Sequence, residues 1–221
     1  YPLNVLIDIS LKFNTENLID YNNFDINQLL TNFGIYENDF FENLYKLLLK
    51  RKKLPLDITM KQLYDHSNVN FIIKTANITK YKIEYINHIN FPDLPVMKAL
   101  RMTSCIPFIF KPIIYKGDYY VDGGLCGNYP IEYNKKIKSK NYLGVQIKSI
   151  DENKKIDNIL NYMLKLTMAP ISPYDDINVK KKNHIILKYN TSVLDMNINK
   201  ETVIKEIAKS YKNTEEYFKN H

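Results

Sequence analysis

The spacing of hydrophobic residues changes several times along the chain. Over residues 1–53 it is helical, and the leucine run that includes Leu44 and Leu48 ends in a basic tail that complements a helix C-terminus. Pro55 is expected to stop this helical region. A short helix is predicted over residues 59–64, because Gln62 follows Thr59 at the spacing of a capping box.

The rest of the pattern predicts strands and helices in turn. Strand-like runs cover residues 70–76, 81–86, 142–147 and 184–189, and helical spacing covers residues 94–103, 156–168 and 200–218. Residues 112–121 predict a hairpin with its turn at Lys116, Gly117 and Asp118. This alternation favours an α/β fold with a largely parallel sheet.

Length and composition suit one globular domain. The chain has 221 residues, of which 45% are hydrophobic and 25% charged, and no repeat or linker interrupts it. No apolar run approaches the roughly 20 residues of a membrane-spanning helix, so any membrane contact is expected to be peripheral. Because residue 1 is a tyrosine and the first residues read like the middle of an element, we expect a chain that starts inside a longer protein. The small number of cysteines favours an intracellular protein.

A formal net charge of +7 favours acidic partners, either an anionic lipid surface or nucleic acid. Basic residues cluster at positions 50–53, 135–140 and 180–182. The simpler interpretation is that these lysines are solvated faces of a lysine-rich protein. No nucleic-acid-binding motif is recognised, so nucleic acid is not an expected partner.

Cysteines and histidines are too few and too scattered to predict a metal site or a bound cofactor. Cys105 and Cys126 are expected to be two reduced thiols. The four histidines, of which none has a partner at helical ligand spacing, are His66, His88, His184 and His221.

Glycine is concentrated in one loop. Four of the 6 glycines fall between Gly117 and Gly127, and Asp122 ends a predicted strand immediately before Gly123 and Gly124. A carboxylate at the end of a strand stands where α/β folds bind their ligands. The two glycines allow close approach of backbone or substrate and make positive φ available. An ordinary Asp-Gly turn is the alternative.

The residues around this loop favour the functional interpretation. A helix ending in Thr103-Ser104-Cys105-Ile106-Pro107 leads through the hairpin to Asp122-Gly123-Gly124 and then to Asn128-Tyr129-Pro130-Ile131. This order closely resembles the second half of the patatin-like phospholipases. Upstream, residues 57–64 and 74–79 are similar to a helix start and a strand end of that family, and the resemblance covers residues 57 to about 147.

The resemblance implies a three-layer α/β/α domain that hydrolyses ester bonds of phospholipids or other acyl lipids through a Ser–Asp dyad, without a metal. Asp122 matches the dyad aspartate, and Gly123 and Gly124 match its neighbours. In the family the serine stands in Gly-x-Ser-x-Gly, and a glycine-rich loop supplies oxyanion donors.

Neither the serine motif nor the glycine-rich loop occurs in these 221 residues. We therefore expect residues 1–221 to be a patatin-like domain that is incomplete at its N-terminus and inactive alone. Ser104 is interpreted as a packing residue and Cys126 as an inert loop thiol. The alternative is a non-catalytic patatin-like protein that binds lipid or a partner.

Overall fold

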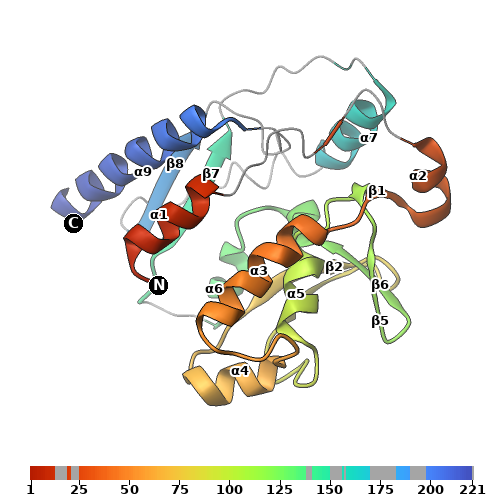
Figure 1. Cartoon of the computed structure of the whole chain (residues 1–221), viewed down its shortest axis with the longest axis horizontal. Coiled ribbons are helices and arrows are strands. Elements are labelled where there is room, and N and C mark those ends of the chain that lie inside the picture. The colour runs from red at the N-terminus through yellow and green to blue at the C-terminus, as the bar shows by residue number, and fades with distance from the viewer. Residues whose placement is uncertain are drawn as a thin grey trace. The chain divides into compact units, whose positions relative to one another are not determined.

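The computed structural model describes residues 1–12, 19–20, 25–137, 141–149, 156, 158–169, 183–189 and 198–220 (Figure 1). The chain forms two compact units. The terminal unit contains both chain ends and comprises residues 1–23, 131–158 and 176–221, and the central unit comprises residues 24–130 and 159–175. Of the residues singled out above, Lys138, Lys140, Lys180, Lys181, Lys182 and His221 lie outside the described part.

The central unit holds most of the elements. Its helices are α2 (Ile26–Asn32), α3 (Asp39–Arg51), α4 (Met60–Ser67), α5 (Val96–Thr103) and α7 (Ile159–Met168). Its strands are β1 (Gly34–Tyr36), β2 (Ile73–Asn77), β3 (Lys82–Ile86), β4 (Phe108–Phe110), β5 (Ile113–Tyr115) and β6 (Asp118–Asp122). A short 3₁₀ helix, η1 (Gly123–Cys126), follows β6 directly.

A four-stranded sheet in the order β3-β2-β6-β5 carries the end of β6. All three of its strand pairs are antiparallel, and Thr75 of β2 is the partner of Asp122. The β5–β6 hairpin closes through Lys116 and Gly117, both with positive φ, so that Tyr115 pairs with Asp118. This two-residue turn with two left-handed residues keeps the hairpin in one register.

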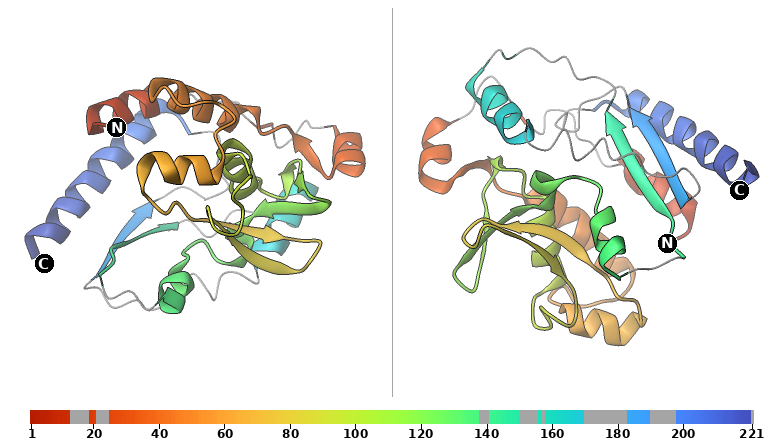
Figure 2. Two further views of the ribbon diagram at one scale, coloured as in Figure 1. Left: turned by 90° about the horizontal axis from the view of Figure 1, so that it is seen from below. Right: turned by 180° about the vertical axis from the view of Figure 1, so that it is seen from behind.

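The buried side of α5 forms part of the core of the central unit. Val96, Met97, Ala99 and Met102 are buried on one side of this helix, as its helical spacing requires. The helix packs against β2, β6 and α3, which are adjacent to it in Figures 1 and 2. Because α5 ends at Thr103 beside the sheet, the residues after it run alongside the end of β6.

The terminal unit contains α1 (Leu3–Lys12), α6 (Ile131–Ile137), β7 (Gly144–Ser149), β8 (His184–Tyr189) and α9 (Lys200–Asn220). Strands β7 and β8 pair in parallel over their whole length, from Gly144–His184 to Ser149–Tyr189. Helix α9 packs against β8 and α1.

The α/β class predicted from the sequence is confirmed, and parallel pairing occurs at β7–β8 and β1–β4. The four-stranded sheet is antiparallel: short connections join β2 to β3 and β5 to β6, and β2 pairs with β6 in the antiparallel sense as well. Strands β1 and β4 and helix α6 were not predicted, and each is short. The capping box is present, with both hydrogen bonds between Thr59 and Gln62.

Candidate active site

Asp122 occupies the last position of β6, half-buried, and the chain turns immediately after it. Its backbone N–H donates to the Cys105 carbonyl at 3.0 Å, which ties the strand end to the segment that follows α5. Its side chain caps the 3₁₀ helix, because Oδ1 accepts a hydrogen bond from the Gly124 N–H at 2.6 Å. No donor reaches Oδ2 in the described part of the chain, so this oxygen remains available as a proton acceptor.

Close contacts surround both glycines after Asp122, with backbone at Gly123 and with side chains at Gly124. A Cβ at Gly123 would stand 2.5 Å from the Lys74 carbonyl oxygen, and one at Gly124 would stand 2.6 Å from Asn128 Oδ1. The expected close approach is therefore present. The expected use of positive φ is not, since the positive-φ glycines of the described chain are Gly117 and Gly127. At Gly123 and Gly124 it is therefore the absence of a side chain that matters, and not access to positive φ.

Burial raises the pKa of Asp122 from 3.8 to about 6. The hydrogen bond from Gly124 and the charge of Lys74 act in the opposite direction, and both are weaker than burial. Lys74 extends from β2 and donates from Nζ to the carbonyls of Cys126 and Gly127, each at 2.8 Å. An aspartate with a pKa near 6 accepts a proton better than an ordinary one and is still ionised at neutral pH.

A polar cluster beside the strand end was missed from the sequence. Asn38 is 1% exposed, and its Nδ2 donates to Ser104 Oγ at 3.0 Å, while its Oδ1 is buried without a partner in the described part of the chain. The Tyr45 hydroxyl also bonds to Ser104, and burial raises the pKa of Tyr45, with a further contribution from the charge of Asp122. Asn38 directly precedes α3, a position at which asparagine commonly caps a helix, but its side chain makes no capping hydrogen bond.

Ser104 is held by these contacts and does not face a base. Its hydroxyl donates to the Leu100 carbonyl at 2.9 Å, in the manner of a serine at a helix end, and accepts the Asn38 amide. No hydrogen bond joins Ser104 to Asp122 among the described residues. The geometry agrees with the structural role predicted for this serine.

Comparison with protein families supplies the context for this site. A profile described as patatin-like phospholipase matches residues 2–134, which is more than half of the chain and includes Asp122, Gly123 and Gly124. The chain belongs to the patatin-like phospholipase family.

Several proteins are similar to this patatin-like chain. A probable lipid hydrolase of Invertebrate iridescent virus 6 is 34% identical over 107 residues, 45% of this chain and 37% of that protein. An uncharacterized protein of Acanthamoeba polyphaga mimivirus is 27% identical over 93% of this chain and 71% of its own length. The uncharacterized protein YqhO of Bacillus subtilis is 29% identical over 58% of this chain and 45% of its own length.

Among solved structures, VipD from Legionella pneumophila aligns with 99% of the patatin-like chain and 46% of its own length, at 18% identity and a TM-score of 0.46. The present chain thus spans less than half of VipD and little more than a third of the iridescent virus relative.

No hydrogen bond joins a thiol or an imidazole to the Asp122 carboxylate in the described part of the patatin-like chain. Burial raises the pKa of Cys105 to about 12, and its Sγ contacts the Lys111 carbonyl. Cys126 is exposed, and neither cysteine forms a disulfide. His88 stacks on Tyr64, His184 bonds to Tyr142, and His66 is exposed. The described residues contain no group of three His, Cys, Asp or Glu side chains arranged to hold a metal.

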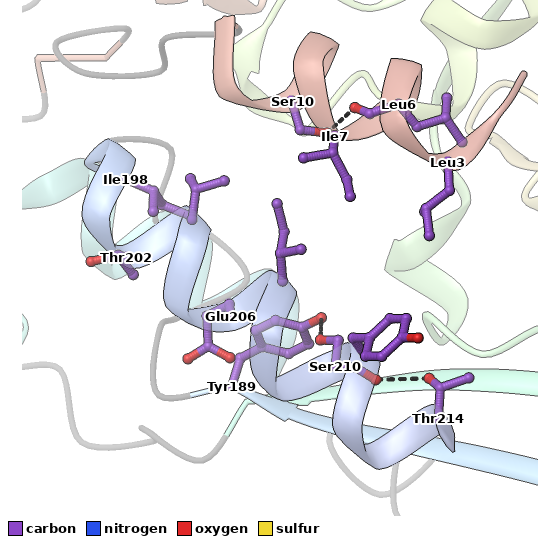
Figure 3. Close-up of a pocket in the computed structure, with 13 residues that line it drawn as sticks. Leu3, Leu6, Ile7, Ser10, Tyr189, Ile198, Thr202, Glu206, Ser210 and Thr214 are labelled. Carbon is purple, nitrogen blue, oxygen red and sulfur yellow. Dashed lines mark hydrogen bonds between the residues drawn. The ribbon is translucent and has the colours of Figure 1, made fainter. Parts of the chain in front are cut away.

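The terminal unit contains an apolar groove of about 670 Å³ between α1 and α9 (Figure 3). Leu3, Leu6 and Ile7 of α1 line one side of it in Figure 3, and Val203 and Ile207 of α9 are also among its lining residues. The hydroxyls that line it bond locally, Ser10 to the Leu6 carbonyl and Ser210 to Tyr189. Glu206 also lines the groove, and no hydrogen bond joins its carboxylate to a hydroxyl among the described residues. None of the described helices is long and apolar enough to cross a membrane.

Proposed function

We propose that the chain supplies the general base of a serine hydrolase that cleaves carboxylic ester bonds of phospholipids or other acyl lipids. Family membership and a relative named as a probable lipid hydrolase support this substrate class. The observation that carries the proposal is Asp122 itself, a half-buried carboxylate with its pKa raised to about 6, one oxygen held by Gly124 and the other without a donor. A base with these properties activates a serine without a histidine.

In the proposed reaction Asp122 takes the proton of a serine hydroxyl while that oxygen bonds to the acyl carbonyl carbon. The carbon–oxygen bond to the lipid alcohol then breaks, and the alcohol leaves with the proton that Asp122 had taken. Water attacks the acyl-serine, gives its proton to the same carboxylate, and releases the fatty acid as the serine recovers its proton. Every step uses the free oxygen of Asp122 and needs no metal.

The serine of this dyad is proposed to lie outside the 221 residues. No Gly-x-Ser-x-Gly occurs in the chain, and Ser104 is bonded to Leu100 and Asn38 instead of Asp122. We infer that the gene product carries this motif elsewhere, with a glycine-rich loop for the oxyanion, and that residues 1–221 are one part of the domain. A gene product without such a serine would be the non-catalytic lipid-binding alternative.

The test is Asp122→Asn in the complete gene product, assayed with a fluorescent phospholipid beside thermal unfolding. The amide keeps the size of the side chain but cannot accept the serine proton, so turnover is expected to fall about 100 to 10,000-fold while the protein stays folded. Gly123→Val is the contrast, because its Cβ meets the Lys74 backbone and disturbs the loop as well as activity. Near-normal turnover in Asp122→Asn would show that the Asp-Gly-Gly segment is only a turn and that Asp122 is not the base.

A further inference from the structure

Tyr45 of α3 is fixed at both ends of its side chain. Its ring stacks on Phe41 with the ring centroids 6.5 Å apart, and Phe41 in turn packs edge to face on Phe110, which is 1% exposed. Its hydroxyl bonds to the Ser104 side chain. Because the ring and the hydroxyl are both anchored, Tyr45 keeps one position relative to the segment that follows α5.

Ser104 connects this tyrosine to the end of β6. The next residue, Cys105, accepts the backbone N–H of Asp122 at 3.0 Å. Asn38, which directly precedes α3 and lies two helical turns before Tyr45, donates to Ser104 Oγ at 3.0 Å. Two residues on the same side of α3 are therefore bonded to the serine that adjoins the contact with Asp122.

Tyr45 also lies within electrostatic reach of the base. In the part of the chain that the structure describes, the ionisable side chains that interact electrostatically with Asp122 are Lys74 from β2, Tyr45 from α3 and Cys105 after α5. Burial is the main cause that raises the pKa of Tyr45 and of Cys105, and the negative charge of Asp122 raises both further. The charge of Lys74 lowers the pKa of Asp122. Tyr45 is thus the neighbour that α3 contributes to the base.

This tyrosine stands at the boundary between a dry cluster and the solvent. Asn38 is 1% exposed and Cys105 is 0% exposed, so the interior of the cluster is closed to solvent. Tyr45 and Asp122 are both half-buried. A side chain at such a boundary decides how far water penetrates, and burial is the main cause that raises the pKa of Asp122.

We propose that Tyr45 is a positioning residue for the base, and that its ring shields the Asp122 carboxylate from water on the side of α3. Tyr45 is assigned no contact with the substrate and acts through Asp122 alone. Loss of the ring admits water, which stabilises the carboxylate and makes it a weaker base. The inference rests on the proposed role of Asp122, which it deepens by naming a second residue that sets the strength of the base.

The experiment is a carbon NMR titration of the Asp122 carboxyl in the 221-residue chain, identified as the signal that is lost in Asp122→Asn. Tyr45→Ala is expected to lower the pKa of Asp122 from about 6 towards the ordinary 3.8, because water reaches the carboxylate. Tyr45→Phe keeps the ring and is expected to titrate close to the parent. Tyr64→Ala is the matched control, since this half-buried tyrosine of α4 contacts His88 and Lys61 and should leave the titration unchanged.

Tyr45→Gln carries the test if Tyr45→Ala does not fold, because glutamine is a good helix former and brings a polar group, so the same fall is expected. The proposal is overturned if the folded variant titrates as the parent does, or if Tyr45→Phe or Tyr64→Ala lowers the pKa of Asp122 as much. In the complete gene product, Tyr45→Ala is expected to move the acidic limb of the activity–pH profile to lower pH. The titration needs no turnover, so a fall of the Asp122 pKa in Tyr45→Ala would support the shielding even if the proposed hydrolysis failed.

Discussion

At the scale of single residues, the candidate site depends on Asp122, whose ionised form is disfavoured by burial in the folded protein. Asp122 is half-buried, and only the Gly124 N–H and the more distant charge of Lys74 favour its ionised form. A folded-state pKa of about 6, above the ordinary value of 3.8, means that the folded protein holds the proton more tightly than the unfolded chain does. The unfolding free energy is therefore expected to fall as pH rises from about 4 to about 6.

This leads to a stability prediction that needs no activity. Asp122→Asn removes the buried charge, so its advantage over the parent should grow between pH 4 and pH 7, reaching about 3 kcal/mol. Urea unfolding of both proteins across this range measures the difference. A difference that does not change with pH would show that the Asp122 carboxyl titrates normally.

Lys74 is expected to tune the same carboxyl. Lys74→Met removes a favourable charge and so raises the pKa of Asp122, which moves the acidic limb of the activity–pH profile of the complete gene product to higher pH. Lys74→Arg, which keeps the charge, should leave that limb close to its original position. If both variants have the same limb, the role of Lys74 is confined to holding the Cys126 and Gly127 carbonyls.

At the scale of elements, the β5–β6 hairpin places Asp122. Its register is set by the two-residue turn at Lys116 and Gly117, with φ of 51° and 83°. Asp118, predicted to be a turn residue, instead begins β6 and is buried, where it accepts a hydrogen bond from Asn77 at 3.0 Å and pairs with Lys80. The hydrogen bond from Lys80 and, after it, the one from Asn77 hold the pKa of Asp118 below its ordinary value.

The turn itself is testable. Gly117→Val is expected to cost about 1–2 kcal/mol, because the position needs positive φ although the space around it is open. Lys116→Asn is the matched change and should be neutral or stabilising, since asparagine adopts this conformation readily. Chemical unfolding compares the two. Equal stability of Gly117→Val and the parent would contradict the assigned turn.

At the scale of the whole molecule, the described chain contains a base without a nucleophile beside it. Incubation of the 221-residue chain with a fluorophosphonate probe is expected to give no labelled serine, because a carboxylate alone cannot form an acyl-enzyme. The complete gene product should be labelled once, at the serine of Gly-x-Ser-x-Gly. Labelling of the 221-residue chain at Ser104, mapped by mass spectrometry, would overturn the proposed dyad.

The sequence alone predicted those elements whose structure is determined by residues close together in the chain. The capping box at Thr59, the strand that ends at Asp122 and the long helix α9 all follow from spacing and turn chemistry over a few residues. The family was recognisable for the same reason, because its signatures are contiguous and occur in one order.

The tertiary structure decided what depends on residues distant in the chain. Asn38 meets Ser104 across 66 positions, and Lys74 reaches Gly127 across 53. Strand β1 exists because Gly34 lets the chain approach the backbone of Phe110 in β4, a contact without any local pattern. The raised pKa of Asp122 also depends on residues distant in the chain, because it results from burial. Burial is produced by every segment that packs around a residue, whereas the sequence shows only that residue's neighbours in the chain.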